Sequence, residues 1–252
     1  MDNTELSSEK IEMSISCKLC NLSFPKLIKA HIIPKSFYGK ETSADEGPAR
    51  LLSTQPFFRS PRSQIGEYDE ELVCASCEKY FAELDDYAHR ILYKDTPKQI
   101  FHNNKHLADD YTTYDREVFR QFVLSLLWRM SATSRKTFSI VRLGNFQITI
   151  SESLKNRDSS YAPFVDAVIS KFDGPLSEAF LFPTKLRIDG INGYRVCFAK
   201  YSCWIVVDQR PLPSPFDALS ISKHSYLRVM RRDFTKSPEL RAMKEMVRRS
   251  EA

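Results

Sequence analysis

Glycine is scarce in this chain, which has seven among 252 residues. The glycine-rich patterns that cradle nucleotide phosphates, G-x-G-x-x-G and G-x-x-x-x-G-K-[ST], do not occur, so a nucleotide-binding glycine loop is not expected. No apolar run approaches the roughly 18 residues that a membrane span needs. The first 14 residues, MDNTELSSEKIEMS, are polar and acidic, unlike a secretory signal peptide. We therefore expect a cytoplasmic protein with no membrane partner.

Excess charge is small and is concentrated at the C-terminus. The formal net charge is +5, and residues 223–252 carry nine Lys or Arg against four Asp or Glu, which accounts for all of it. A basic segment of this kind can contact nucleic-acid phosphates or form a solvated helix face, and both interpretations stay open. The candidate phosphate contacts are Arg231, Arg232, Arg248 and Arg249.

Hydrophobic spacing predicts a mixed α+β chain. Residues 76–93, 115–130, 160–172 and 237–250 are expected to be helical. In the second of these, an apolar stripe is expected to face the core, with Arg129 off the stripe. Strands are expected at 146–150, 181–189, 194–201 and 203–208, with a hairpin loop at 189–193. Residues 39–66 and the histidine-containing stretch 101–110 are expected to be polar loops.

Two Cys-x-x-Cys pairs carry the strongest chemical signal. Disulfides are rare in the cytosol, where paired cysteines more often hold metal. A two-residue gap lets both thiolates of one turn face the same ion, and two such turns complete a tetrahedral zinc site. Four thiolates leave no open position, which indicates a structural rather than a catalytic metal. The expected ligands are Cys17, Cys20, Cys74 and Cys77.

The order of motifs resembles HNH endonucleases of the ββα-metal type. A first Cys-x-x-Cys pair is followed by AHIIPKSF at 30–37 and then by YDEELVCASCE at 68–78, which leads into a helix. The resemblance covers roughly residues 15–92. It implies a zinc-stabilised module with His31 as the general base that activates water, and a divalent ion, Mg²⁺ or Mn²⁺, that stabilises the scissile phosphate.

Ligands for that divalent ion are expected on both sides of the second cysteine pair. Asp69 stands where the family carries an asparagine, and Glu78 where it often carries asparagine or histidine. Further along the same helix, Asp85 and His89 share a face with Glu78, and Asp86 is the alternative to Asp85 if the helix is rotated. The sequence departs from the family at Ala30, where an ion-binding aspartate or histidine is usual.

These observations predict a flexible N-terminus at 1–14, a zinc-bound HNH-like module at 15–95, and a C-terminal α+β domain with antiparallel strands at 96–252. The resemblance implies a metal-dependent endonuclease acting on DNA, in a bacterial phage-defence or mobile-element setting. Because of Ala30, a catalytically degenerate module that binds nucleic acid or a partner protein is the alternative. A zinc-stabilised protein-interaction subunit is the third hypothesis.

Overall fold

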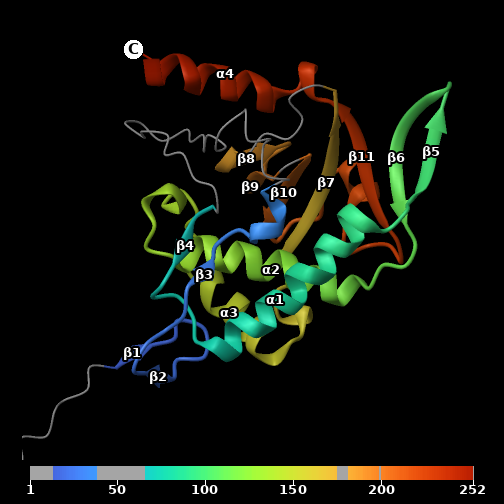
Figure 1. The fold of residues 1–252 in the computed structure, drawn as a ribbon. Helices are drawn as coiled ribbons and strands as arrows, with labels where there is room; N and C mark the ends of the chain where they lie inside the picture. Colours follow the sequence, from blue (N-terminus) through green and yellow to red (C-terminus); the bar gives the residue numbers. More distant parts are fainter. Residues whose placement is uncertain (1–13, 39–65, 175–180, 199, 252) are drawn as a thin grey trace, which may run out of the picture.

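The computed structural model describes residues 14–38, 66–174, 181–198 and 200–251, and of residues 246, 247 and 249–251 the backbone alone. Its centre is a seven-stranded sheet in the order β5-β6-β11-β7-β10-β9-β8 (Figure 1). Neighbouring strands are antiparallel, except β11 and β7, which run parallel. The strands are β5 (Lys98–His102), β6 (Lys105–Tyr111), β7 (Val165–Asp173), β8 (Leu181–Ile188), β9 (Ile191–Phe198), β10 (Tyr201–Val207) and β11 (Leu227–Asp233).

Four α-helices surround this sheet. They are α1 (Ala75–His89), α2 (Arg116–Ala132), α3 (Phe146–Asn156) and α4 (Pro238–Glu251), and α1 continues into a π-helical turn, Arg90–Lys94. Helices α1, α2 and α3 lie together, while α4 lies apart from them at the top of the view (Figure 1). Helices cover both faces of the sheet, as alternating residues of β9 show. Val196 and Phe198 belong to the cluster formed with α1–α3, whereas Cys197 packs with Met243 of α4 on the other face.

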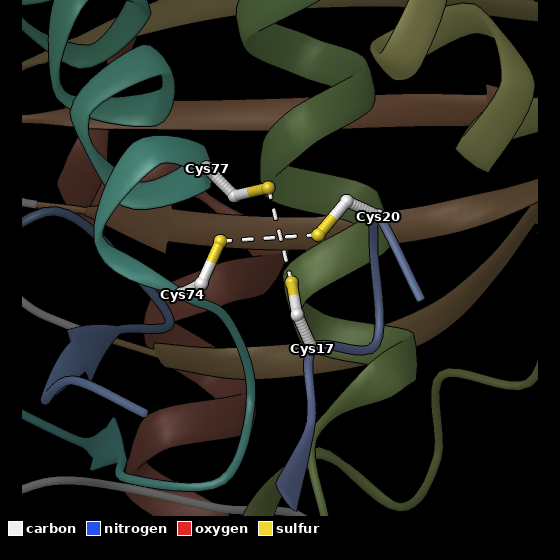
Figure 2. A group of neighbouring side chains, drawn as sticks. All are labelled: Cys17, Cys20, Cys74 and Cys77. Atoms are coloured by element: carbon white, nitrogen blue, oxygen red, sulfur yellow. Dashed lines mark hydrogen bonds between the residues drawn. The ribbon is translucent and has the colours of Figure 1, made fainter. Parts of the chain in front are cut away.

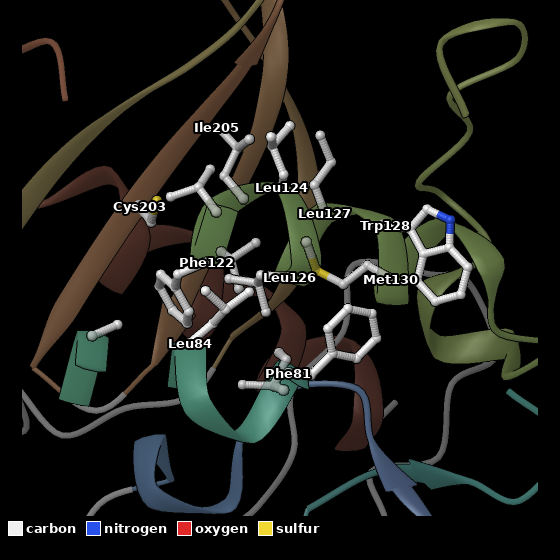
Figure 3. Close-up of a cluster of buried hydrophobic side chains, with 14 of the residues drawn as sticks. Phe81, Leu84, Phe122, Leu124, Leu126, Leu127, Trp128, Met130, Cys203 and Ile205 are labelled. Atoms are coloured by element: carbon white, nitrogen blue, oxygen red, sulfur yellow. The ribbon is translucent and has the colours of Figure 1, made fainter. Parts of the chain in front are cut away.

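The helix α2 forms the middle of the core. Residues 121–130 are buried all round, so α2 contacts neighbours on every side rather than through one stripe. Side chains of α1, α2 and β10 meet there, including Phe81, Leu126 and Ile205 (Figure 3). The expectation that Arg129 lies off the buried stripe is wrong, since Arg129 is 1% exposed.

Two small antiparallel strand pairs lie in the described residues before α1. Strand β1 (Ile15–Ser16) pairs with β2 (Ser23–Phe24), and β3 (Ala30–His31) pairs with β4 (Tyr68–Asp69). The buried residues of this part belong to the same cluster as α2 and the sheet. The core therefore continues across the domain boundary predicted after residue 95. No helix in the described ranges is long and apolar enough to cross a membrane.

Three local predictions are wrong. Residues 146–150, expected as a strand, begin α3, because Ile150 and Leu154 bury one helical face. Most of 160–172, expected as a helix, is the strand β7, whose residues Ala167 to Ser170 are buried in succession, as suits a central strand covered on both faces. The stretch 101–110 is mostly hairpin, since Asn103 and Asn104 take positive φ angles of 48° and 59° and turn β5 into β6.

Candidate metal centre and the His31 face

The four paired cysteines come together at one point (Figure 2). Cys17 and Cys20 lie on the turn between β1 and β2, where Asn21 adopts a left-handed φ of 62° that closes the turn. Cys74 directly precedes α1 and Cys77 lies in its first turn. All four sulfur atoms are within 4.8 Å of one another. The predicted ligand set is therefore assembled from two segments that are more than fifty residues apart.

The spacing of the sulfur atoms fits zinc. Cys17 Sγ lies 3.8 Å from Cys77 Sγ, and Cys20 Sγ lies 3.9 Å from Cys74 Sγ. A regular tetrahedron with Zn–S distances of about 2.3 Å has edges of about 3.8 Å. Burial alone would raise the pKa of Cys74, but hydrogen bonds from Ser76 Oγ and the Cys77 backbone hold it at about 6. These four cysteines could hold a metal ion such as zinc.

The centre joins the first hairpin to the start of α1. Backbone hydrogen bonds reinforce this junction, because Lys18 N donates to Leu72 O at 3.0 Å and Ile28 N donates to Val73 O at 3.3 Å. Cys17 and Cys74 are buried at the edge of the main core. A metal here would fix the position of β3, and with it His31, relative to α1.

His31 lies on β3, opposite Tyr68 of β4. The neighbouring Ala30 pairs with Asp69 and is fully buried, so its methyl group belongs to the core and not to an ion site. The ring of Tyr68 stands edge-on to the imidazole of His31. On the same tyrosine ring, Lys29 Nζ lies 3.4 Å from the ring centroid and the Arg135 guanidinium carbon 5.7 Å from it. An aromatic ring with two cations thus adjoins His31.

Asp85, a predicted ligand of the catalytic ion, is held by an arginine. Arg129 Nη1 donates to Asp85 Oδ2 at 2.9 Å and Arg129 Nη2 donates to Asp85 Oδ1 at 2.6 Å. Arg129 Nη1 also donates to the backbone carbonyl of His31 at 3.1 Å. The guanidinium therefore connects α2, α1 and β3, and it neutralises a carboxylate that the sequence interpretation assigned to a divalent cation.

Glu78 approaches the same group from the first turn of α1. Its carboxylate accepts a hydrogen bond from the His31 backbone N–H. Burial raises the pKa of Glu78 to about 7, although the nearby Arg129 opposes this shift. Among the described residues, Glu78 Oε2 is buried without a hydrogen-bond partner. The structure thus brings His31, Glu78 and Asp85 to one place, around Arg129.

Asp69 is used within the fold. Its Oδ2 accepts from Thr133 Oγ1 at 2.6 Å and from Ser134 N at 3.3 Å, and its Oδ1 accepts from Glu71 N at 2.9 Å. Burial would raise the pKa of Asp69, but these hydrogen bonds outweigh it and hold the pKa below the usual value. The carboxylate ties β4 to the C-terminal end of α2, with both oxygen atoms engaged.

The remaining helix candidates lie apart. His89 packs between aromatic rings, with centroids 5.8 Å from Phe37 and 4.8 Å from Tyr93, and Asp86 is exposed. In the part of the chain that the structure describes, the cysteine centre is the one group of three or more His, Cys, Asp or Glu side chains close enough to share an ion. The proposed divalent-ion ligands do not form such a group.

Two of the four candidate phosphate-binding arginines are engaged in ion pairs on β11. Arg231 pairs with Asp109 at 3.1 Å and with Asp173, and Arg232 pairs with Glu239 at 2.9 Å. Asp109 and Glu239 are each 1% exposed, so these arginines balance buried charges. Arg248 is exposed on α4, and the side chain of Arg249 lies outside the described residues.

Sequence reasoning missed Arg129, Lys29, Tyr68 and Arg135 as members of this region. An arginine inside the otherwise apolar run VLSLLWRM was the available signal for Arg129, since a charge there needs a buried partner. No protein-family model matches the chain, and neither does any curated protein or any solved structure. Its function is therefore inferred from the chemistry of the site.

Proposed function

We propose that the protein is a zinc-organised, HNH-like module that binds nucleic-acid phosphates at the face around His31 and does not cut them with a divalent ion. The observation that carries this proposal is the bidentate pairing of Arg129 with Asp85. The Asp85 carboxylate, next to β3, binds the permanently charged guanidinium of Arg129. The hydrogen-bond donors of this guanidinium are already used, whereas a catalytic metal would keep open coordination positions.

The residues expected to bind the ion of a ββα-metal nuclease have other roles in this fold. Asp69 accepts three hydrogen bonds within the fold. Ala30 offers no ligand and is buried. A single-metal mechanism requires oxygen ligands that leave positions free for substrate and water, and these two positions supply none.

Binding is supported by the surface next to His31. Three exposed basic side chains lie in this part of the chain, Lys29, Arg135 and Lys136. The first two lie over the ring of Tyr68. Cations interleaved with an aromatic ring are the means by which proteins hold phosphate backbones and stack bases. One carboxyl, Glu67, is close to Arg135, and burial raises the pKa of Glu67 while the charge of Arg135 opposes this shift.

A second candidate function is the HNH-like endonuclease, hydrolysing phosphodiester bonds in DNA with Mg²⁺ or Mn²⁺. Glu78 favours it, because this carboxylate lies beside the His31 backbone and keeps one buried oxygen without a partner among the described residues. In that mechanism His31 would act as the general base and Glu78 would contribute to an ion site that forms with substrate.

One set of measurements separates the two candidates. Labelled duplex DNA, single-stranded DNA and RNA are titrated with zinc-loaded protein, and fluorescence anisotropy is followed at several salt concentrations. We expect binding that weakens steeply with salt. The double variant Lys29→Gln/Arg135→Gln should lose roughly tenfold or more in affinity, since two phosphate contacts are removed.

The matched control is Lys98→Gln/Lys155→Gln, which removes two exposed charges far along the chain from His31 and should leave affinity nearly unchanged. The same nucleic acids are then incubated with Mg²⁺ or Mn²⁺ and resolved on gels. Cleavage that disappears in His31→Ala, with zinc content intact, would establish the nuclease in place of the binding module. Absence of salt-sensitive binding would contradict both.

A further inference from the structure

A separate cavity opens between the start of α3 and the strands β8 and β9. It has a volume of about 550 Å³, which is within the range of small-molecule sites. Its basic lining residues are Arg142, Lys185 and Arg187, and no acidic residue lines it. Since the three side chains are exposed, their charges are available to a ligand that enters from solvent.

These three cations have no acidic neighbour among the residues that line the cavity. In the described part of the chain none of them forms an ion pair. A second cavity of about 610 Å³, at the end of β11, shows the contrast. Its Arg231 and Arg232 are paired with Asp109, Asp173 and Glu239. In contrast to Arg231 and Arg232, the three cations of the first cavity are therefore left for a ligand to neutralise.

The other walls of the first cavity are apolar and firmly held. Phe146 lines it, and its ring is backed by Phe164 with centroids 4.4 Å apart. Tyr194 fixes the backbone of Arg142 from both sides, because its hydroxyl accepts from Arg142 N at 3.0 Å and donates to Arg142 O at 2.9 Å. An aromatic wall next to exposed cations suits a ligand with a flat ring and an anionic end.

The start of α3 adds to the positive potential. The first turn of this eleven-residue helix contains no acidic side chain, and the side chain of Asn145 makes no capping hydrogen bond. Phe146 N and Gln147 N donate to Leu143 O and Gly144 O, and no acidic side chain of the first turn offsets the partial positive charge of the helix end. Gly144, which precedes it, lines the cavity as well.

From these features we propose that the cavity is a binding site for a nucleoside phosphate, with the phosphates held by Arg142, Lys185 and Arg187 and the base lying on the wall that includes Phe146. This site is distinct from the His31 face and does not depend on the function proposed for that face. It also does not require a glycine-rich loop, because side-chain cations take the place of backbone N–H groups.

The test uses zinc-loaded full-length protein and ATP as the probe, with binding measured by isothermal titration calorimetry. We expect saturable binding, tighter than that of inorganic triphosphate because the ring contributes. Lys185→Gln/Arg187→Gln should weaken it about tenfold for each cation removed. ATP should also protect Lys185 from acetylation, as read by mass spectrometry of the unmutated protein.

Lys98→Gln/Lys155→Gln again serves as the charge-matched control and should bind ATP as the parent does. Loss of affinity of the same size in the control would overturn the proposal, and so would absence of saturable binding. Equal affinity for ATP and inorganic triphosphate would overturn it, since the apolar wall would then be unused.

Discussion

Arg129 is both fully buried and charged, and its position depends on the carboxylate of Asp85. The Asp85 side chain is 13% exposed and the Arg129 side chain 1%. Two charges can share such an environment when their geometry is good and their remaining donors are satisfied. Here Ser125 O and the His31 carbonyl take further guanidinium donors. The pair therefore fixes β3 against two helices.

Breaking this pair should be costly. We expect Arg129→Met to lower the free energy of unfolding by about 3–5 kcal/mol, because Asp85 would be left buried and uncompensated. Urea unfolding followed by circular dichroism measures this change. Asp85→Leu/Arg129→Met, which removes both charges, should recover much of the loss. A single variant that unfolds within about 1 kcal/mol of the parent would show that the pair is unimportant.

Asp69 should give the protein a specific acid sensitivity. Its folded pKa is lowered from the ordinary value of 3.8, so its ionised form stabilises the fold above that value. The contribution is lost as the pH falls through the folded pKa. At neutral pH we expect Asp69→Asn to be less stable than the parent by about 1–3 kcal/mol.

That difference should start to shrink as the pH falls below about 4, and it should vanish below the lowered folded pKa, where Asp69 is protonated and as uncharged as the asparagine. Thermal unfolding of the parent and of Asp69→Asn between pH 7 and pH 3 measures this difference in stability. Asp86→Asn, at an exposed carboxyl on α1, is the control and should change stability little at either pH. A stability gap for Asp69→Asn that stays constant with pH would contradict the role given to this carboxylate.

The sequence reveals the cysteine centre because ligand spacing within each pair is a local property. The structure also places Glu78, Asp85 and the backbone of His31 around Arg129, but the catalytic and ion-binding roles that the sequence suggests for them stay predictions. Arg129 could not be found in this way. Its partners come from β3 and α1, and their approach is decided by tertiary packing rather than by any spacing along α2.

Among the elements, α2 bears the most buried surface. Eleven of its seventeen residues are buried, including Leu126 at 0% exposure. Helices with strong periodicity were predicted well, and α1, α2 and α4 agree closely with their expected ranges. Segments whose hydrophobic pattern is compatible with both a helix and a strand were predicted wrongly. The segment FQITI, in which apolar and polar residues alternate, is typical of a strand, whereas Val165, Val168 and Phe172 of β7 have the spacing of an amphipathic helix.

Truncating a buried side chain of α2 should therefore lower the free energy of unfolding more than truncating an exposed side chain of a neighbouring helix. We expect Leu126→Ala to reduce the free energy of unfolding by about 3 kcal/mol, through lost burial and the cavity left behind. Ile148→Ala on α3, where the side chain is 69% exposed, should change it by less than about 0.5 kcal/mol. Chemical denaturation of both variants measures the contrast. Similar values would contradict the placement of α2 at the centre.

At the scale of the whole molecule, one hydrophobic cluster includes both the cysteine centre and the sheet. Cys17 and Ile32 belong to it together with Val196 and Ile205. The sequence predicted two domains because the chemically suggestive residues end near residue 95. Composition along the chain cannot show that both parts bury their apolar faces against the same helix.

Removal of zinc should consequently unfold the entire protein. Structural zinc contributes on the order of 10 kcal/mol of folding free energy, comparable to the whole stability of an ordinary domain. Titration with a chelator should abolish the signals of Trp128 in α2 and Trp204 in β10 in one transition, read by fluorescence of single-tryptophan variants. A β10 signal that survives zinc removal would instead support two independent domains.

The last strand of the sheet in the sequence, β11, is inserted between β6 and β7, neither of which pairs with the other. During translation the chain emerges from its N-terminus onward, so the β5–β6 hairpin and the four-stranded unit β7-β10-β9-β8 are both complete before the strand that joins them. Until residues 227–233 are synthesised, β6 and β7 each have an unpaired strand edge, and such edges can pair with the wrong strand. The nascent protein therefore has a late, vulnerable stage at which a chaperone would have most to protect.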